Sequence, residues 1–159
     1  MKPLLHVVLD RPKIAGNIGA IARVCAGTGA ALHVCGPLVF ETKQVAQIHR
    51  PGLDYWPFAQ VHFHHDVHRC LALLPGDPWL IEVGGEQGPH DALLERGGIV
   101  VFGPEDGSVS DSLMSTYQDR ILTLPKLDFV RSFNLAQCVS AVIFEGTRQQ
   151  GGVVDPRQW

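Results

Sequence analysis

The sequence lacks the segments that mark membrane and secreted proteins. None of its apolar runs approaches the ~20 residues that a membrane-spanning helix needs. The start, Met1-Lys2-Pro3, leads directly into a short apolar stretch, which leaves no room for a signal peptide. Four cysteines are present, Cys25, Cys35, Cys70 and Cys138, and no two of them form a Cys-x-x-Cys pair. We therefore expect a cytoplasmic protein with reduced, buried thiols.

An excess of positive charge is also absent. The 159 residues include 13 Lys and Arg against 16 Asp and Glu, which gives a formal net charge of −3. A free-standing nucleic-acid-binding protein usually carries a basic face. If RNA is the ligand, the basic residues must be gathered locally, or two subunits must pool them. Hydrophobic residues make up 45% of the chain and charged residues 18%, which argues against a disordered protein.

Two common nucleotide-binding signatures are missing as well, since the chain contains neither GxGxxG nor GxxxxGK[ST]. Three other loops follow expected strands: Gly84-Gly85, Gly103-Pro104-Glu105 and the stretch after Leu124-Pro125. Ligands of open α/β sheets bind beyond the carboxyl ends of strands, and glycine lets the backbone approach a ligand closely. On the glycines alone, ordinary strand-to-helix turns are the simpler interpretation.

Apolar runs alternate with helical patterns along the chain. The expected strands are residues 4–9, 31–35, 61–63, 79–83, 98–102 and 120–124, and the expected helices are residues 18–28, 42–49, 66–74 and 132–149. A strand, a helix and a second strand in succession form the building block of a parallel sheet. We therefore predict one α/β domain over residues 1–150, with a mainly parallel sheet flanked by helices. Residues 151–159 should form a flexible tail.

Polar side chains lie at two of the expected helix starts. Asn17 precedes the first helix and Ser132 begins the last, and capping of the helix accounts for both. The free amides at the start of the last helix could also hold an anionic ligand group, and the neighbouring Arg131 could bind a phosphate. Arg23 lies on an otherwise small and apolar helix, so it is either a surface residue or a functional one.

Histidines are concentrated in one segment, where His62, His64, His65 and His68 lie close to Asp66. A zinc site is one hypothesis, because His64 and His68 are four residues apart and a helix would align them. The segment has no HExxH motif, and no cysteine pair supports it. We therefore favour structural or solvated histidines and expect no metal.

Several motifs follow one another along nearly the whole chain, from Leu5 to about Gln149. They are Ile14-Ala15-Gly16-Asn17-Ile18-Gly19-Ala20-Ile21-Ala22-Arg23, Gly52-Leu53-Asp54-Tyr55, Phe102-Gly103-Pro104-Glu105, and Leu124-Pro125 with Arg131-Ser132-Phe133-Asn134-Leu135. Together these motifs resemble the SPOUT superfamily of RNA methyltransferases. The likeness is greatest to its small TrmL (YibK-like) branch, the tRNA wobble-position 2′-O-methyltransferases.

This resemblance implies a fold and a cofactor. The fold is an α/β sheet whose C-terminal part forms a deep trefoil knot, a rare exception to ordinary chain topology. The cofactor is S-adenosylmethionine, held in the knot largely by backbone groups. The cofactor-binding residues that the motifs imply are Val83, Gly84, Gly103, Leu124, Ser132 and Asn134.

The resemblance also implies a homodimer, with each active site completed across the interface. The implied substrate is tRNA, methylated on the ribose of the wobble nucleotide 34, a cytidine or uridine. The implied catalytic residues are Arg23, Asn17 and Glu105, and Arg131 and His33 would contact the RNA. Because a guanidinium stays protonated, we expect Arg23 to orient the attacking hydroxyl electrostatically rather than to act as a base.

The chain departs from the family pattern at several positions. Asp106-Gly107-Ser108-Val109 stands where relatives have Thr-Arg-Gly-Leu, so a basic residue is missing there. Ala136 replaces a serine, and Phe144 replaces an aromatic residue with a hydroxyl group. Two alternatives stay open: a methyltransferase for rRNA or another tRNA position, and a non-catalytic protein of the same fold that binds RNA or the cofactor.

Overall fold

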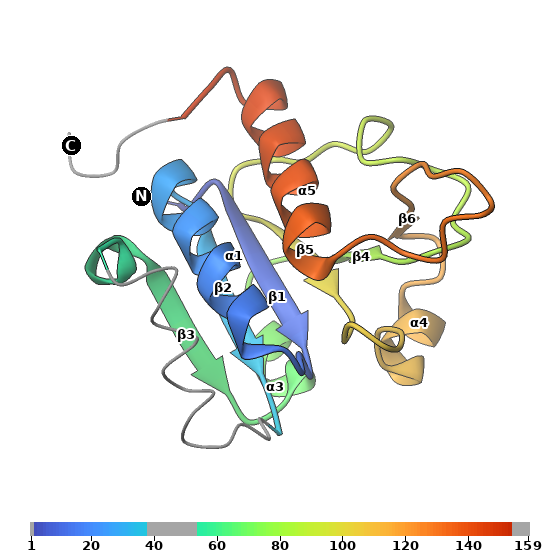
Figure 1. Ribbon diagram of the computed structural model, residues 1–159, viewed down its shortest axis with the longest axis horizontal. Coiled ribbons are helices and arrows are strands. Elements are labelled where there is room, and N and C mark those ends of the chain that lie inside the picture. Colours follow the sequence, from blue (N-terminus) through green and yellow to red (C-terminus); the bar gives the residue numbers. More distant parts are fainter. Residues whose placement is uncertain (1, 38–53, 154–159) are drawn as a thin grey trace.

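A six-stranded parallel sheet forms the centre of the structure (Figure 1). The computed structural model describes residues 2–37 and 54–153. The strands are β1 (Leu5–Asp10), β2 (Ala31–Cys35), β3 (Gln60–His64), β4 (Trp79–Ile81), β5 (Gly98–Phe102) and β6 (Ile121–Leu122), in the spatial order β3-β2-β1-β5-β4-β6. All pairs between these strands are parallel, which confirms the predicted α/β class.

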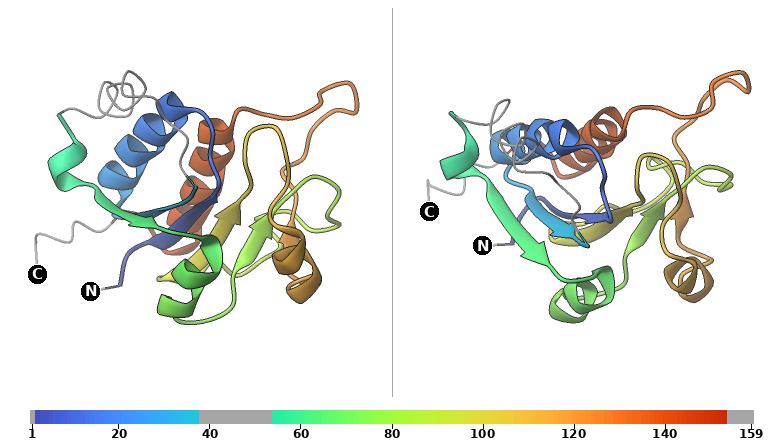
Figure 2. Two further views of the ribbon diagram at one scale, coloured as in Figure 1. Left: turned by 90° about the horizontal axis from the view of Figure 1, so that it is seen from below. Right: turned by 60° about the horizontal axis from the view of Figure 1, so that its bottom comes forward.

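Helices cover both faces of the sheet (Figure 2). On one face lie the two long helices, α1 (Ala15–Thr28) and α5 (Leu135–Gln149). On the other face lie the short helices α3 (Val67–Leu73) and α4 (Asp111–Thr116). A 3-10 turn, η1 (Trp56–Phe58), precedes β3. No helix in the described ranges is long and apolar enough to cross a membrane.

The central strands are continuous apolar runs because both of their faces are covered. On the α1 and α5 side, Leu5 and Leu9 pack with Ile18 and Val139 in one buried cluster. Helix α5 lies so close to β1 that a Cβ atom at Gly146 would come within 2.9 Å of the Leu5 side chain. A second cluster, beneath α3 and α4, includes Val8, Cys35, Cys70 and Leu113.

The two long helices begin at other residues than expected. Helix α1 starts at Ala15, so Asn17 lies inside the helix and is not its N-cap. Helix α5 starts at Leu135, and its N-cap is Asn134, whose side chain accepts hydrogen bonds from the amides of Ala136 and Gln137. The expectation that Ser132 caps this helix is therefore wrong, because the chain becomes helical only three residues later.

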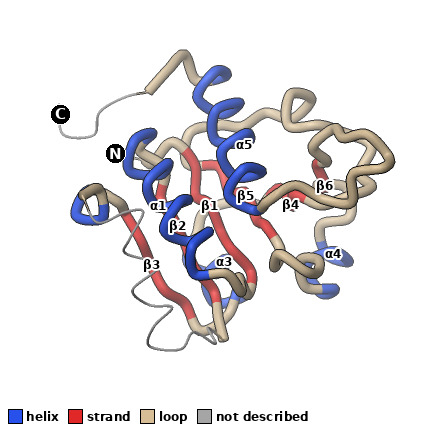
Figure 3. The backbone as a smooth tube through the Cα atoms, viewed as in Figure 1, coloured by secondary structure: helices blue, strands red, loops and turns tan. Residues whose placement is uncertain are grey.

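Other boundaries also differ. Helix α4 was not expected, since its six residues are too few to give a clear periodic pattern. Strands β4 and β6 are shorter than predicted, and the chain leaves the sheet at Glu82 and Thr123. The loops after β4 and β6 then run beside each other, as Figure 3 shows, joined by a hydrogen bond from Thr123 N to Gln87 O at 2.7 Å. The predicted helix over residues 42–49 and the end of the predicted tail lie outside the described residues.

Candidate active site

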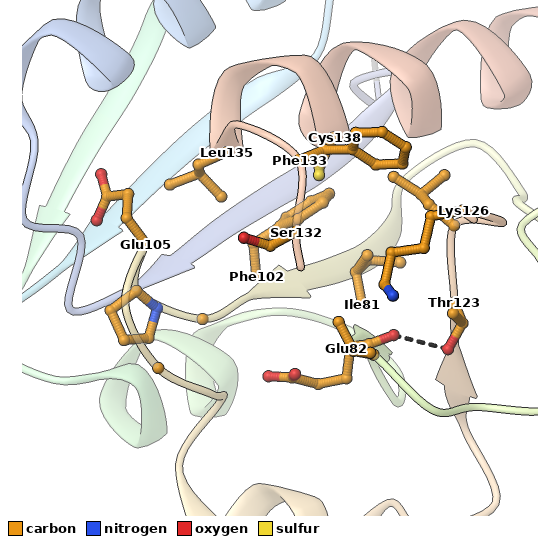
Figure 4. Close-up of a pocket in the computed structure, with 15 residues that line it drawn as sticks. Ile81, Glu82, Phe102, Glu105, Thr123, Lys126, Ser132, Phe133, Leu135 and Cys138 are labelled. Atoms are coloured by element: carbon orange, nitrogen blue, oxygen red, sulfur yellow. Dashed lines mark hydrogen bonds between the residues drawn. The ribbon is translucent and has the colours of Figure 1, made fainter. Parts of the chain in front are cut away.

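A pocket opens where the chain leaves β4, β5 and β6 (Figure 4). Its lining residues are Ile81, Glu82, Val83, Phe102, Gly103, Pro104, Glu105, Gly107, Thr123, Leu124, Lys126, Ser132, Phe133, Leu135 and Cys138. They come from the carboxyl ends of three neighbouring parallel strands, from the loops that follow these strands and from the start of α5. Open α/β sheets bind their ligands at this edge. A mainly apolar lining with a few polar groups is typical of a small-molecule site.

Gly103 owes its identity to the close approach of two backbone segments. A Cβ atom added there would lie 2.5 Å from the amide nitrogen of Val109 and 2.6 Å from the carbonyl carbon of Ser108. Both atoms belong to the backbone, so neither can rotate out of the way as a side chain could. The loop after β5 therefore folds tightly back over the strand end, and this shapes one wall of the pocket.

Glu82 and Thr123 join the ends of β4 and β6. The Thr123 hydroxyl donates to the Glu82 carbonyl oxygen at 2.7 Å, the dashed line in Figure 4, and accepts from Gly85 N at 2.5 Å. The Glu82 carboxylate accepts a hydrogen bond from Val109 N. Desolvation of this half-buried carboxylate raises the pKa of Glu82 above its usual range, against the opposing effect of that hydrogen bond. The pocket thus contains an acid whose charged form is disfavoured by its surroundings.

A polar network connects the rim of the pocket to both long helices. The Glu105 carboxylate accepts from the amides of Lys13 and Ile14 at 2.7 and 3.0 Å, just before α1, and from Asn17 Nδ2 at 3.0 Å. Asn17 Oδ1 in turn accepts from Asn134 Nδ2 at 3.0 Å. A carboxylate at a helix start is favoured by the helix dipole and by the free amides there. Glu105 therefore performs the capping of α1 that was expected of Asn17.

Comparison with known proteins identifies the family. Residues 4–144 match the model of the SpoU rRNA Methylase family. The chain belongs to this family. A member from Bacillus subtilis is 38% identical over 151 residues, which cover 92% of this chain and 93% of its own. The tRNA (cytidine(34)-2′-O)-methyltransferase from Burkholderia pseudomallei is 36% identical over 152 residues, which cover 93% of this chain and 97% of its own.

Solved structures that resemble this chain support the family match. A structure from work on 2-OH methylation of C/U34 on tRNA gives a TM-score of 0.84 at 32% identity and covers 92% of this chain and 96% of its own. Together with the family match, this likeness confirms the knotted SPOUT fold that the motifs implied. Two more distant structures, a SpoU methyltransferase from Streptomyces viridochromogenes and an rRNA methyltransferase from Sinorhizobium meliloti, contain AdoMet.

The pocket at the ends of β4, β5 and β6, called the SpoU pocket below, contains four of the six residues that the motifs implied for cofactor binding. Val83, Gly103, Leu124 and Ser132 line it. Gly84 is not among the lining residues; it continues the turn after β4 with a φ of +92°, which favours glycine. Asn134 is also not a lining residue, because its side chain caps α5 and bonds to Asn17.

Five polar or bulky lining residues were not singled out from the sequence: Glu82, Thr123, Lys126, Phe133 and Cys138. Figure 4 shows Glu105 and Lys126 on opposite sides of the pocket. The available signal was position, since Glu82 and Thr123 are each the second-to-last residue of a predicted strand, 79–83 and 120–124. Which of these side chains turn inward depends on how the loops fold back.

The arginines lie outside the pocket of this chain. Arg23 is exposed on α1, and its guanidinium carbon lies 4.7 Å from the centre of the Tyr55 ring. Arg131 is exposed in the loop that leads to α5. Neither is a lining residue of the SpoU pocket. A direct role for Arg23 therefore requires that it reach the pocket of another chain.

His33 does not have the surroundings expected of an RNA contact. Its side chain is only 4% exposed on β2. Its Nε2 bonds to His6 Nδ1 and its Nδ1 bonds to His64 Nε2, both at 3.0 Å. Because both ring nitrogens already have partners within the sheet, the expected contact between His33 and RNA is not supported.

Proposed function

We propose that this chain is a tRNA 2′-O-methyltransferase that methylates the ribose of nucleotide 34, a cytidine or uridine, with S-adenosylmethionine as the methyl donor. The observation that carries the proposal is the pocket at the ends of β4, β5 and β6. Two of the family motifs contribute to it, one through Gly103 and the other through Leu124 and Ser132. The full-length match to the Burkholderia pseudomallei tRNA (cytidine(34)-2′-O)-methyltransferase supports the choice of substrate.

The lining residues suit this cofactor. Ile81, Phe102 and Leu135 offer an apolar surface for a flat adenine ring, and the backbone at Gly103 is open to close approach. The Glu82 carboxylate lies where a positively charged ligand would compensate for its burial. When bound, S-adenosylmethionine supplies an electrophilic methyl group. The residues of the chain then have to hold the ribose hydroxyl in line with it and keep water away.

Positioning of the hydroxyl is the main catalytic task, because holding reactants in near-attack geometry is worth about 7–11 kcal/mol in favourable cases. We assign this task to Arg23, acting as an electrostatic group on the hydroxyl or an adjacent phosphate. A guanidinium stays protonated, so the proton of the hydroxyl leaves to a substrate phosphate or to solvent. The Glu105–Asn17–Asn134 network holds the starts of α1 and α5 in fixed positions at the rim.

The active unit in this proposal is a homodimer. Arg23 does not line the pocket of its own chain, so a second copy must supply it. Apolar side chains are exposed near the starts of α1 and α5, with Ile14 at 51% and Phe133 at 43%, and Phe144 on α5 is 57% exposed. Such a surface is suited to burial against a second chain. Two copies would also pool Arg23 and Arg131 around one RNA.

The test uses tRNA in which single ribose hydroxyls are removed. Unmodified tRNA is compared with tRNA carrying a 2′-deoxy residue at position 34 and with a matched control carrying it at position 33. We expect labelled S-adenosylmethionine to mark the unmodified and control tRNAs but not the first variant. Label that persists on the 34-deoxy tRNA would move the reaction to another position. Label on rRNA alone would replace tRNA as the substrate.

A further inference from the structure

Histidine and cysteine side chains gather on the face of the sheet covered by α3, at the edge opposite the methyl-transfer pocket. In the parallel register of β2 and β3, His33 lies beside His62 and Cys35 lies beside His64. Figure 2 shows α3 packed against this part of the sheet, on the side away from α1 and α5. Helix α3 contributes Cys70, which is fully buried. We propose that His33, His64 and Cys70 bind a zinc ion.

The three candidate ligand atoms already lie close together. One ligand atom each from His33, His64 and Cys70 lies within 4.8 Å of the other two. In a tetrahedral zinc site with bonds of about 2.0–2.3 Å, neighbouring ligand atoms are separated by about 3.4–3.7 Å. His33 Nδ1 and His64 Nε2 are 3.0 Å apart and would separate slightly around an ion. Small rotations of side chains would therefore complete this arrangement.

A neighbouring histidine holds His33 in the tautomer that zinc requires. If His33 binds through Nδ1, its proton is on Nε2, which faces His6 Nδ1 at 3.0 Å. A metal-binding histidine usually donates its second N–H in this way, and the partner fixes the ring. His64 would bind through Nε2 after the proton that this atom donates to His33 Nδ1 has moved to its own Nδ1, and the Cys70 thiol would lose its proton to solvent on binding.

The set of donors favours zinc among the common metals. Imidazole nitrogen and thiolate sulfur are ligands of zinc, whereas calcium and magnesium require oxygen. The Cys35 thiol interacts with Cys70 and is a candidate for the fourth ligand. His62 is exposed and His64 is half-buried, so the cluster can be reached from solvent at the β3 edge. Bound zinc would join β2, β3 and α3 and so stabilise this edge.

The arrangement differs from the zinc site that spacing within residues 62–68 suggested. His64 ends β3, whereas His68 lies on α3 and bonds to the Ser112 hydroxyl through Nε2 at 3.0 Å. These two histidines therefore do not share a helix. The partners of His64 instead come from β2 and α3, and His33 is 31 residues away in the sequence.

The test is zinc binding by the full-length chain after treatment with a chelator. Titration with Zn²⁺ alone, in competition with a coloured chelator, should give one ion per chain. At a free concentration about 100 times the Kd, zinc should raise the midpoint of thermal unfolding by about 5–10 °C. Replacement of zinc by Co²⁺ should give the sulfur-to-cobalt absorption band of a thiolate ligand.

Two variants and a matched control decide between the outcomes. His64→Ala changes a half-buried side chain at the sheet edge, so the chain should fold, and it should lose both the stoichiometric binding and the thermal shift. Cys70→Ser should weaken the sulfur-to-cobalt band, because it removes one of the two candidate thiolates. His65→Ala, an exposed neighbour outside the cluster, should bind zinc like the wild type. The proposal is overturned if the wild type binds no stoichiometric zinc, or if folded His64→Ala binds zinc as tightly as the control.

Discussion

Single residues in this protein are constrained by neighbours that are distant in the sequence. Gly103 is fixed by the backbone at Ser108 and Val109, and Asn17 is fixed by Glu105 and Asn134, which are 88 and 117 residues away. Asn17 is 7% exposed, so loss of either partner would leave a buried polar group without a hydrogen bond. Substitutions at such positions should act on both the fold and the pocket.

Gly103→Ala should destabilise the chain and weaken cofactor binding. The added methyl group would lie 2.5 Å from a backbone nitrogen, so the loop after β5 must move away from the strand. Overpacking of this kind costs about 1–3 kcal/mol. Urea unfolding and calorimetric titration with S-adenosylmethionine measure the two effects.

The matched control is Gly27→Ala. Gly27 lies on the exposed side of α1, where an added Cβ would meet nothing within 4 Å. Alanine is the better helix former by about 1 kcal/mol, so this variant should be as stable as the wild type or more so. Equal losses of stability in both variants would contradict the explanation by close approach.

Glu82 should give the stability of the protein a particular dependence on pH. Burial raises the pKa of this carboxyl, so the folded chain holds the proton more tightly than the unfolded chain does. The contribution to stability is therefore complete below the ordinary glutamate pKa of about 4.3, and it is lost as the pH rises through the higher folded value. Above that value the ionised, half-buried carboxylate disfavours the folded state.

Glu82→Gln removes this titration while keeping an oxygen that can accept from Val109 N. The free energy of unfolding of the variant, relative to wild type, should increase as the pH rises from about 4 towards neutrality. Urea titrations of both proteins at a series of pH values measure this difference. Parallel curves over the whole range would show that Glu82 titrates alike in the folded and unfolded chains.

At the scale of elements, strands were easier to predict than helix starts. The apolar runs of β1, β2 and β5 gave their positions to within a residue, because strands covered on both faces consist of continuous apolar residues. The start of α1 was misplaced because the group that caps it, Glu105, follows β5 and lies about ninety residues away. The residues around the start of α1 therefore do not indicate which group caps the helix.

The candidate site was also only partly predictable from local sequence. Glycines after strands indicated the correct loops, and Gly103 does line the pocket. Lys126 and Phe133 come from the long loop between β6 and α5, and their inward direction follows from the way this loop folds back. The sequence showed the histidines of residues 62–68 as a cluster but not His33, because His33 meets His64 only where the neighbouring strands β2 and β3 pair.

Asn134→Ala should destabilise the protein, whereas Ser132→Ala should leave its stability unchanged. The Asn134 side chain accepts from two amides at the start of α5 and donates to Asn17. Loss of an N-cap costs about 1 kcal/mol, and the broken bond to Asn17 adds to this. Thermal or urea unfolding of both variants measures the contrast. A larger loss of stability in Ser132→Ala than in Asn134→Ala would show that Ser132, and not Asn134, caps α5.

At the scale of the whole molecule, we propose that the activity is carried out by two chains together. The net charge of −3 provides no general attraction for RNA, so arginines must be concentrated at the active site. Arg23 is exposed and outside the pocket of its own chain. A dimer that brings Arg23 of one copy to the pocket of the other would meet both requirements.

Arg23→Ala should reduce methyl transfer by about 100-fold or more and leave binding of S-adenosylmethionine unchanged. Arg23→Lys should recover only part of the activity, because lysine keeps the charge but not the planar fork. Single-turnover rates and calorimetric titration measure the two properties. If the sites are shared, mixing Arg23→Ala chains with Gly103→Ala chains, whose own pocket binds the cofactor weakly, should give more activity than either variant alone, since one site of the mixed dimer is intact. No recovery from mixed dimers that are shown to form would place Arg23 in its own chain's site.

The most direct test of the central claim is to incubate the protein with radiolabelled S-adenosylmethionine and tRNA from a strain that lacks the enzyme, and then to map the labelled nucleotide. The account predicts label on the 2′-oxygen of the ribose at position 34. A folded, cofactor-binding protein that leaves this ribose unlabelled would contradict it.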